Sequence, residues 1–345
     1  MKGFYLFMGW KLYYSKLRFK QVFGRKKWVM DQYDKMVKES KSCKNTWYNR
    51  VDFLLSYMMF GAEPEDYFAG EYFEKRNPFY RNHCVTRTRL KAVMKCLNSP
   101  EALKVFNSKE DFNTLFKDFI GRKWCCPHEI DEEAFVNQFA ASGKDVFVKP
   151  LDGFGGRGIF KAPGGEENLR KLYKDLTSDG KKYIVEEYYQ QKGFLHDVNP
   201  SSLNTLRFIS MRDGDKVTPL YSFFRAGGAG SIVDNLHSDG VSYIIDITNG
   251  ELLKGVTWKE NNIQVHPSTG IKVTGYKIPN WDKVIEFATK LHRNAPEGMH
   301  MVGWDICISD DELTVIEGNG SPMFLSDVHY SDNNWKKLRS LMNKM

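Results

Sequence analysis

The segment DVFVKPLDGFGGRGIFKA, residues 145–162, decides between fold classes. Two short strand-like runs flank a glycine-rich loop with the spacing G-x-G-x-x-G, formed by Gly153, Gly155, Gly156 and Gly158. In a dinucleotide-binding fold such glycines open a helix that faces the pyrophosphate. Here Ile-Phe-Lys-Ala and then Pro-Gly-Gly follow, which predicts a strand and a turn. The segment therefore predicts a β-hairpin whose loop can fold over phosphates. For the loop alone, a simple surface hairpin is the alternative.

Lys149 ends the first strand of this hairpin, where its ammonium group can reach phosphates beneath the glycines. Two other phosphate-binding folds are excluded by sequence. The P-loop pattern GxxxxGK[ST] is absent, and so are the HRD and DFG motifs that accompany the glycine hairpin of protein kinases.

Outward from this hairpin, short strands dominate the sequence up to about residue 325, with helices expected at 166–178 and 281–293. The other expected strands are 182–189, 205–211, 217–226, 242–246, 301–308 and 313–319. Because few helices separate these strands, the pattern predicts antiparallel α+β layers rather than a doubly wound parallel sheet.

The part before the hairpin is predominantly helical. We expect helices at 28–60, 86–97 and 99–106, with an irregular segment at 61–84.

A further helix is expected after Ser108, which caps it with Asp111 at the third helical position, and Gly121 closes it. The predicted organisation is a basic helical region (1–105), two α+β lobes (106–195 and 196–325) and a C-terminal helix (326–345).

The basic charge of the chain is concentrated at its start. Residues 1–50 carry 13 Lys+Arg and 3 Asp+Glu, a net +10, whereas the whole chain carries +7. The remaining residues are therefore slightly acidic, and we expect no nucleic-acid partner. Residues 1–28 interleave lysines and arginines with aromatic residues, which predicts contact with the inner membrane surface. A helix packed on the domain with a solvated basic face is the alternative.

We expect a cytoplasmic protein, from its cysteine pattern and the lack of a signal peptide. Hydrophobic residues make up 41% and charged residues 27%, as in ordinary globular proteins, and disorder is excluded. The six cysteines show no CxxC or zinc spacing, which indicates reduced thiols. No run of 18 apolar residues occurs, and the first residues lack a signal-peptide cleavage site.

The segment MVGWDICISDDELTVIEGN, residues 301–319, predicts a second hairpin. Glu317 and Asn319 are two apart and share a face, and Asp305 lies on the preceding strand. Asp305 faces Glu317 directly only if Asp311 is the centre of an odd-numbered loop. Two carboxylates and an amide oxygen suit Mg²⁺. The alternative is the polar face of an edge hairpin.

Together these features resemble the ATP-grasp superfamily, with ATP held between two α+β lobes. The motifs SLNTLRFIS, VDNLHSDGVSYIID, HPSTG, IPNW and VGWDICI…VIEGN resemble the sugar-transfer-associated ATP-grasp family of bacterial surface-polysaccharide gene clusters. The resemblance covers roughly residues 105–325.

The resemblance implies nucleotide-binding roles for several residues. Lys109 matches the first ATP-grasp lysine, although Ser108 replaces the usual aspartate before it. Lys149 matches the second lysine, on the α- and β-phosphates. The adenine-binding strand and its neighbourhood are matched by Glu186, Glu187, Tyr188 and Asn204.

The resemblance also implies the catalytic set. Arg207 matches the arginine that stabilises the transferring phosphoryl group. Asp305, Glu317 and Asn319 match the ligands of two magnesium ions, with Glu317 bridging. Phosphoryl transfer depends mainly on such positioning and charge neutralisation.

The segment FFRAGGAGSIVDNLHSDG, residues 223–240, contains two further candidates. Arg225 can hold a carboxylate with two hydrogen bonds, and His237 can accept a proton from an attacking amine. A long surface loop is the alternative. We expect His266 and His300 to be structural.

The sequence thus predicts an ATP-dependent carboxylate–amine ligase with an acyl-phosphate intermediate, acting on small-molecule substrates such as an amino acid and a uronic acid. One alternative is a phosphotransferase of the same fold that phosphorylates a hydroxyl group. Another is a non-enzymatic nucleotide-binding protein. The sequence names neither the acid, the amine nor the oligomeric state.

Overall fold

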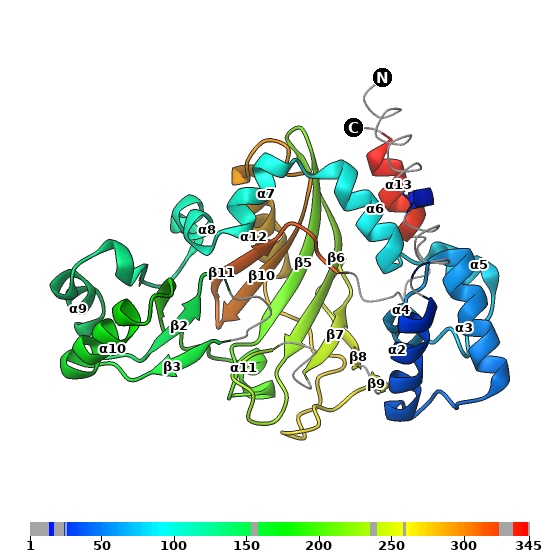
Figure 1. Ribbon diagram of the computed structural model, residues 1–345, viewed down its shortest axis with the longest axis horizontal. Coiled ribbons are helices and arrows are strands. Elements are labelled where there is room, and N and C mark those ends of the chain that lie inside the picture. The colour runs from blue at the N-terminus through cyan, green and yellow to red at the C-terminus, as the bar shows by residue number, and fades with distance from the viewer. Residues whose placement is uncertain are drawn as a thin grey trace.

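The protein consists of two antiparallel β-sheets with helices around them (Figure 1). The computed structural model describes residues 14–16, 24, 26–152, 158–234, 240–257, 260–323 and 334–343. Every pairing between the described strands is antiparallel. The predicted α+β architecture is confirmed.

The smaller sheet forms the first lobe and has the strand order β1-β4-β2-β3. Its elements are β1 (Trp124–Cys125), β2 (Val146–Pro150), β3 (Phe160–Ala162) and β4 (Tyr183–Glu187), covered by α9 (Glu132–Ala140) and α10 (Glu166–Ser178). The glycine hairpin is confirmed, because β2 pairs with β3 through Val146 and Ala162. Gly158 has φ +74°, a conformation that favours glycine.

The larger sheet forms the second lobe and has the strand order β11-β10-β5-β6-β7-β8-β9. Its strands are β5 (Thr205–Asp213), β6 (Lys216–Ala226), β7 (Val241–Ile245), β8 (Leu252–Val256), β9 (Asn261–Ile263), β10 (Met301–Ser309) and β11 (Glu312–Asn319). The helices of this lobe are α11 (Phe194–Val198) and α12 (Trp281–Asn294), whose apolar side packs on the sheet.

The other face of the larger sheet is divided into an apolar and a charged part. Ile209, Met211 and Met301 pack against α6 (Arg87–Leu97) and α13 (Asn334–Met342), which are far apart in the sequence. Further along the same strands, the side chains on this face are charged and border the cleft described below.

The helices α2 (Lys26–Glu39), α3 (Trp47–Phe60), α4 (Pro64–Ala69) and α5 (Pro78–His83) enclose a separate aromatic core. The single helix expected at 28–60 is wrong. The chain leaves the helix after Glu39, and Thr46 caps a new helix by accepting a hydrogen bond from Asn49 N. The segment 61–84 is also less irregular than expected, because α4 and α5 each begin with a proline.

The helices that lead into the first lobe agree better with the sequence. They are α6, α7 (Pro100–Asn107) and α8 (Lys109–Leu115), followed by the 3₁₀ turns Lys117–Phe119 and Pro127–Glu129. Ser108 caps α8 as predicted, accepting from Asp111 N. The helix ends at Leu115, however, before Gly121. The prediction for residues 1–28 falls mostly outside the described residues.

Candidate active site

Four charged side chains lie side by side on four adjacent strands of the larger sheet. Glu317 on β11 pairs with Asp305 on β10, which pairs in turn with Arg207 on β5. Arg225 on β6 is opposite Thr205, two residues before Arg207 and therefore on the same face. Cross-strand pairing thus produces a row with two acids followed by two arginines.

The row depends on a β-bulge in β11. Asp305 faces Glu317 as predicted, but Ile306 already faces Val315, so Ile316 is an extra residue. The turn contains only Asp310 and Asp311, between the paired ends of the strands, so the expected odd-numbered loop is wrong. The bulge, rather than the turn, restores the register between the two acids.

Arg122 fixes this bulge and connects the two lobes. Its guanidinium donates to the backbone carbonyls of Val315 (2.9 Å) and Ile316 (3.3 Å) in the second lobe. It also donates through Nε to Glu186 in the first lobe, at 2.8 Å. Arg122 is only 8% exposed, so these contacts lie in the interior between the lobes.

Asp305 is buried and held ionised by the two arginines of the row. Arg207 donates to both of its carboxylate oxygens, and Arg225 contacts Oδ2 at 2.8 Å. Burial alone would raise the pKa of Asp305, but the two guanidinium groups outweigh burial and lower it to about 2. The carboxylate is therefore a negative charge at neutral pH.

Glu317 lies beside this fixed charge. Enclosure by the protein raises the pKa of Glu317, and the neighbouring Asp305 carboxylate raises it further. The Glu317 side chain nonetheless remains exposed to solvent in the cleft. Asn319 Nδ2 donates to Glu317 Oε1 at 3.2 Å. Two adjacent carboxylates and an amide fit a divalent cation, which would neutralise their repulsion.

The first lobe supplies cations on the opposite side. Lys149 Nζ lies 2.5 Å from Glu186 Oε2, and Asn113 donates to Glu186 Oε1 at 3.2 Å. Arg122 and Lys149 lower the pKa of Glu186 despite its burial. Lys109 Nζ donates to the backbone carbonyl of Pro150 (3.0 Å), and burial lowers the pKa of Lys109.

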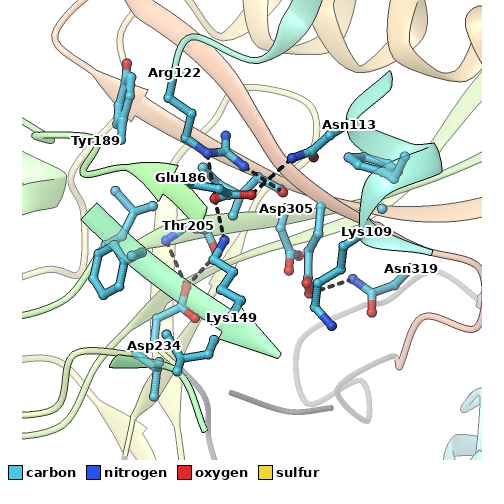
Figure 2. A pocket seen from close by; sticks show the side chains of 18 of the residues that line it. Lys109, Asn113, Arg122, Lys149, Glu186, Tyr189, Thr205, Asp234, Asp305 and Asn319 are labelled. Atoms are coloured by element: carbon cyan, nitrogen blue, oxygen red, sulfur yellow. Dashed lines mark hydrogen bonds and ion pairs between the residues drawn. The ribbon is translucent and has the colours of Figure 1, made fainter. Parts of the chain in front are cut away.

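These groups surround one cavity of about 360 Å³ between the lobes. Figure 2 shows Tyr189 on one side and Lys109 and Asn319 on the other, with Glu186 between them. The predicted site residues that line the cavity are Lys109, Lys149, Glu186, Glu187, Arg225, Asp305, Glu317 and Asn319. Arg207 contacts the site through Asp305.

Three of the described residues predicted to bind ATP, Gly158, Tyr188 and Asn204, lie outside the lining of this cavity. Tyr188 donates its backbone N–H to the Asp145 carbonyl (2.8 Å), and its ring contacts Phe147. Asn204 is buried, and its amide donates to carbonyls including those of Leu195 and Asn199. These contacts give Asn204 a structural role.

The predicted Gly153, Gly155, Gly156 and His237 lie outside the described residues. Gly158, at the edge of the loop, is described and begins the return towards β3.

Sequence reasoning missed Arg122, Asn113, Thr205 and Asp234. Asp234 accepts from Thr205 N (3.1 Å) and from its hydroxyl (2.5 Å), and lies 3.4 Å from Arg225 Nε. Asp234 falls within the motif VDNLHSDG, which was a usable signal. No local pattern distinguishes Arg122, because its contacts with Glu186, Val315 and Ile316 are all distant in sequence.

Gly318 lies between the metal-ligand candidates Glu317 and Asn319, and only a glycine fits there. A Cβ atom at this position would lie 2.6 Å from the Phe106 ring and 2.7 Å from the Phe112 ring. The phenylalanines of α7 and α8 therefore pack directly on the backbone between Glu317 and Asn319. This packing explains the glycine in the sequence E-G-N.

A second group of metal-ligating side chains lies outside the cavity lining. Ligand atoms of Glu110, Cys126 and His128 lie within 4.8 Å of one another. Burial raises the pKa of the Cys126 thiol to about 12, which keeps it protonated. This group is separate from the predicted magnesium site.

The sequence profile of the sugar-transfer associated ATP-grasp family matches residues 72–340. The chain therefore belongs to this family, and the resemblance seen in its motifs is confirmed.

Curated relatives match a smaller part of the chain. The glutathione synthetase of Pseudomonas syringae pv. tomato is 32% identical over 146 residues, which cover 42% of this chain and 40% of the relative. That of Pseudomonas aeruginosa is 28% identical and covers 48% and 49%. The chain thus spans about half the length, or less, of these relatives.

Similar solved structures include ATP-dependent enzymes of several kinds. The D-alanine–D-alanine ligase from Bacillus anthracis is 11% identical, covers 72% of this chain and 71% of its own, and has a TM-score of 0.42. The N5-carboxyaminoimidazole synthase from Aspergillus clavatus, bound to ADP and 5-aminoimidazole ribonucleotide, is 11% identical, covers 74% and 57%, and has a TM-score of 0.45. These scores are too low to transfer residue roles.

Proposed function

We propose that this protein is an ATP-dependent carboxylate–amine ligase that modifies a building block of a bacterial surface polysaccharide, such as a capsule or O-antigen sugar. The observation that carries the proposal is the row from Glu317 to Arg225, which shares one cavity with Lys149 and Lys109. Anionic and cationic groups on opposing walls are what a magnesium–nucleotide complex requires.

The nucleotide would occupy the cavity between the lobes. Lys149 would contact the α- and β-phosphates, and Lys109 would contact a phosphate from the same side of the cavity. Because Lys149 now contacts Glu186, binding ATP would exchange one anionic partner for another. Arg122 would keep Glu186 compensated during this exchange, since it contacts the same carboxylate oxygen at 2.8 Å.

Asp305, Glu317 and Asn319 would hold magnesium, with Glu317 bridging two ions. The ions would neutralise the phosphate oxygens and orient the γ-phosphate. Arg207 would set the position and charge of Asp305, which it already contacts through both carboxylate oxygens.

The proposed reaction has two steps. A substrate carboxylate attacks the γ-phosphorus, a new O–P bond forms, and the bond to the β-phosphate oxygen breaks to release ADP. An amine then attacks the acyl phosphate carbon, the C–O bond to phosphate breaks, and the amine loses a proton. The second step releases inorganic phosphate and leaves an amide.

Two residues would act on the substrates. Arg225 lines the cavity and would orient the substrate carboxylate. Its guanidinium group already contacts Asp305, Asp234 and Thr205, and the substrate would share it with them. His237 would accept the amine proton. The match to proteins named glutathione synthetase supports a ligase. We propose that the reaction takes place in the cytoplasm.

The test is ADP release with amino acids crossed against uronic acids and nucleotide-linked uronates, in the presence of ATP and magnesium. We expect one pair to stimulate ADP release, and hydroxylamine added in place of the amine should give a hydroxamate. A phosphate ester without a hydroxamate would show that the protein is a phosphotransferase instead.

A matched pair of variants assigns the activity to the cleft. Lys149→Met should abolish ADP release, because a contact to the phosphates is lost. Lys161→Met should preserve it, because this lysine of the same sheet lies outside the cavity lining and pairs with Asp145. Equal activity in both variants would refute the role of Lys149.

A further inference from the structure

Helix α3 exposes large apolar side chains to solvent. The exposed fractions are 78% for Trp47, 57% for Tyr48, 49% for Leu55, 53% for Met58 and 64% for Met59. Single exposed apolar residues are normal in soluble proteins, but a continuous group on one helix marks an interaction surface.

Helical geometry makes this group continuous. At about 100° per residue, the outward-facing side chains of α3 fall within an arc of about 140°. From one edge to the other they are Leu54, Trp47, Met58, Val51, Leu55, Tyr48 and Met59. Every side chain in this arc, here called the outer face of α3, is apolar or aromatic.

The inward side of the same helix is the more polar one. It carries Asn49 and Ser56 beside Phe53, whose ring stacks on Tyr33 with centroids 4.6 Å apart. An ordinary surface helix buries its apolar side and exposes polar groups. In α3 the outer face is apolar as well, and within the described part of the chain it stays largely exposed.

The net charge of the N-terminal residues indicates which kind of partner can cover the outer face of α3. Residues 1–50 carry a net +10, and Arg76 lies over the Tyr48 ring, with its guanidinium carbon 4.0 Å from the ring centroid. Helix α2 runs antiparallel to α3, since Asp34 pairs with Arg50 and Tyr33 with Phe53. The basic sequence before α2 therefore joins it near the Met58 end of α3.

We propose that the outer face of α3 is a docking surface for an anionic lipid bilayer. Apolar and aromatic side chains would insert at the interface, and the net positive charge of residues 1–50, together with Arg76 beside Tyr48, would attract lipid phosphates. A second copy of the chain fits less well, because two regions of the same positive charge would repel each other.

The position of α3 is compatible with an active enzyme at the membrane. Figure 1 shows α3 at one edge of the molecule, remote from β2 and β11, whose residues Lys149 and Glu317 line the cavity. Among the described residues, no helix has both the length and the apolar character needed to cross a bilayer. Contact would be peripheral and would leave the cleft accessible.

The test is co-sedimentation of the full chain with vesicles of phosphatidylcholine alone or mixed with an equal part of phosphatidylglycerol. We expect binding to the anionic vesicles only, weakening as salt is added. The double variant Leu55→Gln/Met59→Gln should bind at least about tenfold more weakly, because two inserted apolar side chains are lost.

The matched control is Leu115→Gln/Val265→Gln, which changes two apolar residues of similar exposure (41% and 44%) elsewhere. It should bind like the unchanged protein. Circular dichroism checks that both variants are folded. Equal binding by the α3 variant, or no binding of the unchanged protein, would overturn the proposal. So would a dimer in sedimentation equilibrium that the α3 variant abolishes without any effect of lipid.

Discussion

The cleft between the lobes and the outer face of α3 differ in whether their side chains have partners within the protein. In the cleft, Asp305 is contacted by Arg207 and Arg225, and Glu186 is contacted by Arg122 and Lys149. On α3, large apolar side chains such as Trp47 and Met59 are exposed to water.

This difference separates two kinds of function. A buried charge without a partner is costly, so a charged cleft is stable without a ligand only if its charges are paired with one another. An exposed apolar surface can exist without a partner, but it is stabilised when one covers it. Ligands of the cleft therefore exchange existing contacts, whereas a partner of α3 adds new ones.

The largest expected effect is at Glu317. We expect Glu317→Gln to lower magnesium-dependent ADP formation about a thousandfold, because a neutral amide cannot compensate two bridged cations. Asn319→Asp keeps an oxygen ligand and should retain most of the activity. Steady-state ADP release measures both variants, and near-normal turnover by folded Glu317→Gln would contradict the magnesium assignment.

The two sides of α3 should respond oppositely to truncation. Phe53→Ala removes a ring from the core and should lower the free energy of unfolding by about 3–5 kcal/mol. Leu55→Ala, on the outer face, should change it by no more than about 0.5 kcal/mol. Urea denaturation in the absence of lipid measures both, and a large loss for Leu55→Ala would show that the face is already covered.

Arg122 should matter for stability as well as for activity. Arg122→Gln leaves the buried Glu186 with less compensation and frees the carbonyls of the bulge, so we expect the free energy of unfolding to fall by about 2–3 kcal/mol. Arg170→Gln is the control, since this arginine pairs with exposed glutamates such as Glu133 and should change stability little. Equal losses in urea denaturation would argue against a special role for Arg122.

A smaller effect is expected in the pH dependence of magnesium binding. Because the pKa of Glu317 is raised, its proton must leave before the cation binds, and affinity should fall as the pH decreases. The decline should begin above the ordinary glutamate range and approach about tenfold per pH unit. Calorimetric titration from neutral pH to about pH 5 measures it. A flat profile, or one unchanged by Glu317→Gln, would contradict the pKa assignment.

The sequence predicted the parts of the fold that depend on local patterns. Two such patterns are confirmed, and each extends over only a few residues. One is the pair of strand-like runs around the glycine loop, which forms the β2–β3 hairpin, and the other is the capping residue Ser108. The break between α2 and α3 was missed because apolar periodicity on both sides of Ser40 concealed it. The short β1 and β9 were missed because two or three residues carry too little pattern.

The site was predictable to a similar extent. The sequence placed Asp305 and Glu317 on the two strands of one hairpin, but their direct pairing depends on the bulge at Ile316. No local pattern predicts this bulge, because Arg122 contacts it from nearly two hundred residues away in sequence. Asp234 and Thr205 were also missed, since their contacts exist only once β5 and β6 are paired. The motif VDNLHSDG marks the segment that contains Asp234, but its hydrogen bonds to Thr205 join residues 29 apart in sequence.

The central claim is that a carboxylate is activated by phosphorylation in the cleft. The most direct test uses the acid that stimulates ADP release, labelled with ¹⁸O in its carboxylate, together with ATP, magnesium and the amine. One labelled oxygen should appear in the released inorganic phosphate, because the O–P bond formed in the first step stays intact when the amine displaces phosphate. Amide formation with unlabelled phosphate would contradict the acyl-phosphate mechanism.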